Sequence, residues 1–104
     1  MSVIHVGVKN LRKLGYNSLQ EWMKDENNVY IGRACHYVSV GASEWSNPYT
    51  VKKYGREECI EMYREYVIKE KGDRIKELKG KVLGCWCKPE KCHGDVLIEL
   101  LAKL

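Results

Sequence analysis

The fold is indicated most clearly by residues 82–101, which read VLGCWCKPEKCHGDVLIELL. The first six residues of this stretch are mostly apolar and predict a strand, and the Lys-Pro-Glu-Lys tetrad that follows predicts a turn. An apolar stripe that starts at Val96 then predicts a helix, which we expect to begin at Cys92 or His93. A strand joined to a helix by a short turn is a unit of the layered α/β folds.

Short strands and helices alternate along the rest of the chain as well. The strongest helical periodicity lies between Gly55 and Gly72, where Cys59, Ile60 and Tyr63 recur at helical spacing. We therefore expect one small α/β domain over residues 1–104, with a short, mainly parallel sheet and helices packed on its faces. The other predicted elements are strands at 3–8 and 29–31, helices at 18–23 and 73–78, and loops at 10–15 and 34–54, with an edge strand or none at 37–40.

The length and the cysteine content bound the class of protein. A chain of 104 residues has room for one hydrophobic core, which needs no disulfides to be stable. The five cysteines are an odd number, and residues 1–5 lack the basic and apolar regions of a secretory signal. We therefore expect free thiols or metal ligands in the cytoplasm. The longest apolar run, residues 96–98, is too short for a membrane span.

The formal net charge of +4 is spread along the chain, and lysine and glutamate alternate in several places. A dedicated nucleic-acid binder concentrates its basic residues on one face, so this pattern favours an ordinary solvated surface. Nucleic acid is therefore a weakly supported partner. No pattern in the sequence indicates an oligomeric state.

Three thiols and one imidazole fall within nine positions near the C-terminus. Cys85 and Cys87 would point to the same face of a strand, because strand side chains alternate, and the turn would return Cys92 and His93 beside them. Such a cluster can bind Zn²⁺ tetrahedrally if the helix starts after His93. Three thiolates can also hold an iron–sulfur cluster. The second Cys-His pair, Cys35 and His36, could supply a missing fourth ligand, but we favour coincidence.

The same residues allow a reading without metal. Cys92 would lie at the N-terminus of the last helix, where the helix dipole lowers the pKa of a thiol and binds anions. Cys92 would then be a nucleophile or a redox centre, and His93 or Asp95 would move protons. The plain alternative is that Cys85 and Cys87 are small buried hydrophobic residues, which is also what we expect of Cys59.

A second candidate feature is the stretch from Trp45 to Tyr49, which contains Asn47-Pro48. The two aromatic side chains could grip a planar ligand such as a base. Arg33, after the second predicted strand, and Arg56, at the start of the long helix, could hold a phosphate or carboxylate. The alternative is a turn whose aromatic side chains fill the core beside surface arginines.

These motifs together resemble domain-of-unknown-function family 4326, a small domain of bacteria, phages and large DNA viruses. The resemblance covers most of the chain and implies that the motifs form one site or one structural kernel, but it implies no activity. One departure is that residues 34–43 form a longer link than is usual in the family. The motifs are Tyr30-Ile31-Gly32-Arg33, Trp45-x-Asn47-Pro48-Tyr49, Gly55-Arg56-Glu57-Glu58 and Cys85-Trp86-Cys87-x-Pro89-x-x-Cys92-His93-Gly94-Asp95.

We therefore expect an anionic, nucleotide-like ligand at the carboxyl edge of the sheet, where ligands of α/β proteins bind. The alternative is a zinc-stabilised module that contacts nucleic acid or protein. Whether the protein is an enzyme is left open. The candidate residues are Arg33, Trp45, Asn47, Tyr49 and Arg56 for ligand binding, Cys92, His93 and Asp95 for catalysis, and Cys85, Cys87, Cys92 and His93 for zinc.

Overall fold

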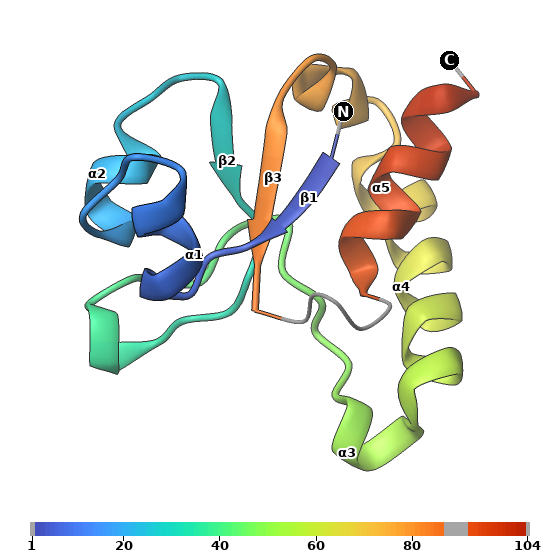
Figure 1. Ribbon diagram of the computed structural model, residues 1–104. Helices are drawn as coiled ribbons and strands as arrows, with labels where there is room; N and C mark the ends of the chain where they lie inside the picture. The colour runs from blue at the N-terminus through green and yellow to red at the C-terminus, as the bar shows by residue number, and fades with distance from the viewer. Residues whose placement is uncertain (1, 87–91, 104) are drawn as a thin grey trace.

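A parallel three-stranded sheet forms the centre of the protein. The computed structural model describes residues 2–86 and 92–103, and its strands are β1 (Ser2–His5), β2 (Asn28–Tyr30) and β3 (Val82–Cys85). Their order is β1-β3-β2, so β3 lies in the middle and pairs in parallel with both neighbours (Figure 1). The predicted parallel sheet is confirmed, and all three strands end at the same edge.

Helices cover both faces of this sheet, as predicted. On one face lie α1 (Val8–Lys13) and α2 (Leu19–Met23), and on the other lie α4 (Arg56–Lys71) and α5 (His93–Ala102) (Figure 1). Within the described residues no helix has the length and apolar character to cross a membrane. The remaining helical elements are the short helix α3 (Val51–Tyr54) and the 3-10 helices η1 (His36–Val38) and η2 (Ile75–Leu78).

Alternation along the strands produces two hydrophobic cores. Val3, Leu83 and Val29 are paired across the sheet and belong to the core under α4 and α5. The next row, Ile4, Gly84 and Tyr30, faces α1 and α2. Because consecutive side chains point to opposite faces, each strand supplies both cores.

The N-terminal segment differs from the prediction. The strand expected over residues 3–8 ends at His5, and α1 forms where residues 10–15 were expected to be a loop. The chain turns at Gly7, whose N–H donates to His5 Nδ1 (2.9 Å). Leu11 then anchors the helix because it is completely buried, in the core that also contains Trp22 and Tyr30. The polar residues of this segment led us to predict a loop, and that prediction is wrong because a single buried side chain holds the helix in place.

The other elements follow the predictions more closely. The helix between Gly55 and Gly72 is confirmed, and α5 begins at His93 with Cys92 as its N-cap. The helix expected over residues 73–78 is shorter and of the 3-10 type, and η1 lies where we expected an edge strand or none at residues 37–40. Trp86 forms a bend after β3, and the predicted turn at 88–91, with Cys87 before it, lies outside the described residues.

Candidate functional site

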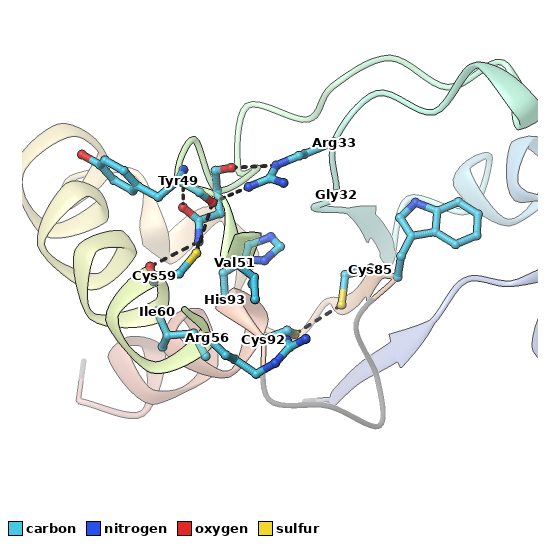
Figure 2. A pocket seen from close by; sticks show the side chains of 12 residues that line it. Gly32, Arg33, Tyr49, Val51, Arg56, Cys59, Ile60, Cys85, Cys92 and His93 are labelled. Carbon is cyan, nitrogen blue, oxygen red and sulfur yellow. Dashed lines mark hydrogen bonds between the residues drawn. The ribbon is translucent and has the colours of Figure 1, made fainter. Parts of the chain in front are cut away.

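A pocket of about 170 Å³ lies where the carboxyl ends of β2 and β3 meet the starts of α4 and α5 (Figure 2). The sequence motifs converge on it from four places in the chain. The pocket is therefore built at the sheet edge where we expected a ligand site. Its lining residues are Gly32, Arg33, Asn47, Tyr49, Val51, Arg56, Cys59, Ile60, Cys85, Trp86, Cys92 and His93.

Two thiols from separate elements meet at this pocket. Cys85 is the last residue of β3 and Cys92 is the N-cap of α5. Their Sγ atoms are 3.2 Å apart, and the exposed fractions of the two residues are 0% and 2%. The structure thus brings together two of the four predicted zinc ligands, although seven positions separate them in the sequence.

His93 joins the start of α5 to the end of β2. Its Nε2 lies 2.6 Å from the carbonyl oxygen of Ile31, which can only accept, so Nε2 carries a proton. The imidazole is buried, and Tyr63 packs edge-on against it with ring centroids 4.9 Å apart. While Nε2 donates its hydrogen bond to Ile31, Nδ1 is the nitrogen through which this ring would bind a metal or accept a proton.

Tyr63 is a buried polar side chain beneath this site. Its hydroxyl donates to the carbonyl oxygen of Trp45 at 2.6 Å. Burial raises the pKa of Tyr63 well above the ordinary value of 10, with smaller contributions from Tyr66 and Cys92. The phenol therefore stays neutral and acts as a fixed donor between α4 and the loop before it.

Asp95 caps α5 and is not among the pocket-lining residues. Its carboxylate accepts the backbone N–H of Cys92 (Oδ2···N 3.1 Å), which completes a capping box at the start of the helix. The structure thus places Asp95 as a group that positions the backbone of Cys92, where we had expected a proton-transfer residue. The capping bond is by itself a sufficient reason for an aspartate three residues after the N-cap, and it requires no catalytic role.

Arg33 and Asn47 hold the loop that forms one wall of the pocket. Arg33 Nε donates to the Asn47 carbonyl oxygen (3.0 Å), and the same guanidinium donates to the Tyr49 carbonyl oxygen. The buried Asn47 amide accepts the Tyr49 N–H (2.9 Å) and donates toward the carbonyl oxygen and Sγ of Cys59 on α4 (3.3 and 3.1 Å). Asn47 therefore uses both ends of its amide to fix the wall.

The two aromatic side chains expected to stack on a ligand are placed differently. Trp45 is 4% exposed and belongs to the core under α4 and α5, where Lys71 Nζ lies 5.6 Å from its ring centroid. The ring of Tyr49 packs edge-on against Tyr54 and Tyr66 and points away from the thiols (Figure 2). Trp45 fills the core because it is the largest apolar side chain of its loop.

Arginines supply the charge of the pocket. Arg56 is the first residue of α4 and is half-buried, and its side chain extends toward Cys92 (Figure 2). Arg56 and Arg33 are the charged side chains among the described lining residues, and none of those residues is a carboxylate. The N-terminus of α5 adds the positive end of a helix dipole. The formal charges of the described lining residues are therefore positive.

The predicted metal centre is placed in part, and the condition set for all four ligands is not met, because α5 begins at His93 and not after it. Among residues 2–86 and 92–103, no three side chains of His, Cys, Asp or Glu are arranged to hold a metal ion. Cys87, the fourth predicted ligand, lies outside this set. Neither Cys35 nor His36 lines the pocket, and the ring of His36 stacks on that of Tyr37 with centroids 4.8 Å apart.

Several lining residues had not been assigned to the site from the sequence. Cys59 was expected to be core and is indeed 2% exposed, yet it also lines the pocket. Trp86 lines the pocket and donates from Nε1 to the Tyr30 hydroxyl at 2.7 Å. Alternation predicts that Trp86 lies on the opposite face of the strand from the thiols, and it does pack against the core under α1 and α2. It lines the pocket as well because it directly follows the carboxyl end of β3.

The fold and the pocket together define a small α/β domain with a pocket at the carboxyl edge of a parallel sheet, lined in part by arginines and thiols. The chain belongs to the family described as "Domain of unknown function (DUF4326)", which matches residues 16–103. This agrees with the resemblance found in its motifs.

Two viral proteins are similar to this chain. The "Uncharacterized protein R718" of Acanthamoeba polyphaga mimivirus is 41% identical over 85 residues, which cover 70% of this chain and 65% of the mimivirus protein. The "Uncharacterized 12.4 kDa protein in nrdA-td intergenic region" of Enterobacteria phage T4 is 32% identical over 95 residues, covering 75% of this chain and 87% of the phage protein. The chain thus spans slightly less than two thirds of the mimivirus protein. No solved structure shows a significant match.

Proposed function

We propose that the pocket binds a small anionic ligand of the nucleotide-like class. The observation that carries this proposal is that Arg33 and Arg56, which come from different parts of the chain, line one pocket. Guanidinium groups bind phosphate and carboxylate oxygens in a bidentate manner. The start of α5 and the carboxyl edge of the sheet are also preferred places for such ligands.

The size of the pocket limits how much of a ligand it can enclose. Its volume of about 170 Å³ is below the roughly 300 Å³ at which pockets begin to enclose drug-sized molecules. A phosphate, a sugar ring or a base fits, and the rest of a nucleotide would project from the opening. We therefore place the anionic group between the two arginines and propose no enclosed stacking site.

Cys92 is the residue that this arrangement offers for chemistry. The N-terminus of a helix and a nearby guanidinium favour the thiolate, which is the nucleophilic form of cysteine. Arg56 extends toward Cys92, so a ligand held by Arg56 would lie beside the thiol. We propose that a bound ligand protects Cys92 from alkylation by iodoacetamide, which peptide mapping measures.

A thermal-shift screen tests ligand binding. The probes are nucleoside mono-, di- and triphosphates, nucleotide sugars and inorganic phosphate, because binding to the native state raises Tm. For a ligand that does so, Arg56→Ala should weaken binding by about 10- to 150-fold, since a hydrogen bond to a charged group contributes roughly 1.5–3 kcal/mol.

The matched control is Lys52→Ala, which removes an exposed positive charge from α3 at a position outside the pocket lining. It should change the affinity little if the arginines act by contact and not through overall charge. The proposal fails if no probe raises Tm, or if Arg56→Ala and Lys52→Ala weaken binding equally.

The second candidate function is a zinc-stabilised module that contacts nucleic acid or protein. It is favoured by the 3.2 Å separation of Cys85 and Cys92, since sulfurs bound tetrahedrally to one zinc at about 2.3 Å lie roughly 3.8 Å apart. A small opening of the pair would admit the ion, and Cys87 would be a third ligand. Elemental analysis of untagged protein tests this: one equivalent of zinc supports it, and less than one equivalent, with stability unchanged by chelator, excludes it.

We propose that the protein acts in the cytoplasm, which in an infected cell is that of the host. The relatives from mimivirus and phage T4 support an origin among viruses that replicate inside cells. Free thiols at a functional pocket also suit a reducing compartment. Fractionation of cells expressing the tagged protein tests this, and recovery with membranes or in the medium would contradict it.

A further inference from the structure

The pair of thiols at the pocket is closer than packing of two buried cysteines requires. The Sγ atoms of Cys85 and Cys92 are 3.2 Å apart, about 1.2 Å more than the roughly 2.05 Å of a disulfide bond. Both residues are buried, and both line the pocket, so the pocket is the route by which a reagent can reach them.

Rigid elements hold both cysteines in place. Cys85 lies on the central strand, in register with His5 of β1. Cys92 is fixed by the capping box with Asp95, at the start of a ten-residue helix. Gly94 brings that helix close to the sheet, since a Cβ there would lie 2.8 Å from Val3 Cγ2. The approach of the thiols therefore follows from the packing of α5 on the sheet.

We propose that Cys85 and Cys92 form a reversible dithiol–disulfide pair that reacts with low-molecular-weight disulfides. One thiolate attacks a sulfur of the external disulfide, which breaks the external S–S bond and releases one small thiolate. The second cysteine then attacks the protein sulfur of this mixed disulfide and releases the second small thiolate. In sum, the two protein thiols lose two protons and two electrons, and the external disulfide gains them as two thiols.

This reaction would change the pocket. The Cys92 sulfur that faces the ligand site as a thiol is tied to Cys85 in the oxidised form and is no longer available as a nucleophile. The inference rests on the thiol geometry and does not depend on the proposed ligand. It holds equally if the pocket binds no nucleotide-like molecule.

Peptide mapping after equilibration in glutathione redox buffers tests the inference on the native protein. Trypsin cuts after Lys81, Lys91 and Lys103 but is blocked between Lys88 and Pro89. Cys85 and Cys87 thus share the peptide 82–91, whereas Cys92 lies in the peptide 92–103. A disulfide to Cys92 joins these two peptides, whereas a Cys85–Cys87 disulfide stays within one.

The variant Cys87→Ser identifies the partner of Cys92. We expect the joined peptides to form in this variant as in the unchanged protein. The oxidised form should have two fewer titratable thiols than the reduced form of the same protein. Excess reduced glutathione should separate the peptides again. Cys92→Ser, which keeps a good N-cap residue, should abolish the link. Zinc-free protein, prepared with chelator, is used in each arm so that a bound ion cannot mask the thiols.

Two results would overturn the inference. In the first, both thiols stay reduced in folded protein at every glutathione ratio, while the same peptides become linked after unfolding. In the second, the link disappears in Cys87→Ser, which would assign the disulfide to Cys87 and Cys92. A trivalent arsenical gives an independent check, because it bridges two thiols only when they are close: Cys87→Ser should still bind one equivalent, and no binding would count against the pair.

Discussion

The substitution Gly84→Ala should destabilise the protein through a clash in the core under α2. A Cβ at this position of the central strand would lie 2.5 Å from Trp22 Cη2 and 2.5 Å from Val6 Cγ1. Ordinary contacts begin near 3.4 Å, so each neighbour would have to retreat by about 0.9 Å. Both neighbours are 1% exposed and have little space to move into.

The expected magnitude is the difference between two effects. Overpacking of a core costs about 1–3 kcal/mol, and replacing a strand glycine by alanine returns roughly 0.5–1 kcal/mol of backbone entropy. Because two buried side chains must both move, the overpacking cost is expected in the upper part of its range, about 2–3 kcal/mol, and the net loss in the free energy of unfolding is about 1–2.5 kcal/mol. For a domain of this size that corresponds to a fall in Tm of roughly 4–20 °C.

Urea and thermal unfolding measure this loss. The matched control is Gly41→Ala, where the added Cβ meets no atom within 4 Å and stability should stay equal or rise slightly. In the double variant Gly84→Ala/Val6→Ala, part of the clash is removed, so its cost should be less than the sum of the two single changes. The reasoning is refuted if Gly84→Ala is as stable as Gly41→Ala, or if the two changes are strictly additive.

Two further outcomes follow from the site. Because burial raises the pKa of Tyr63 above 10, the unfolded chain loses this proton first as the pH rises, and the free energy of unfolding should fall above about pH 10. Tyr63→Phe should flatten that fall in urea titrations, and an unchanged slope would contradict the assignment. Asp95→Ala removes the carboxylate that accepts the Cys92 N–H and should cost about 1 kcal/mol of stability. If Asp95 instead moves protons, the variant would lose reactivity at Cys92 while keeping its full stability, which alkylation rates and unfolding together would reveal.

Local pattern was sufficient for the elements that carry strong periodicity. The helix α4 and the start of α5 were both predicted, because an apolar stripe and a cap are properties of neighbouring residues. The helix α1 was missed since its residues are mostly polar and Leu11 alone anchors it. Its stability comes from burying Leu11 in a core with Trp22 and Tyr30, which lie too far along the chain for a local window to contain.

Some features of the candidate site could likewise be predicted from local sequence, and others depended on the folded structure. Arg33 and Cys92 reached the pocket as expected, because parallel strands and the helix that follows them open on one edge. The roles of Trp45 and Asp95 were decided by contacts made in the folded chain. A large aromatic side chain in a loop suits a ligand or a core equally well until its neighbours are known.

The sequence by itself determined the α/β class, the parallel sheet, the family and the segments that form the pocket, since these depend on periodicity, caps and motifs. Only the tertiary structure decided that Cys85 and Cys92 face each other at 3.2 Å while His93 turns to the carbonyl oxygen of Ile31. The reason is physical: side chains adjacent in the sequence diverge at the start of a helix, and which one meets the strand depends on how the helix packs.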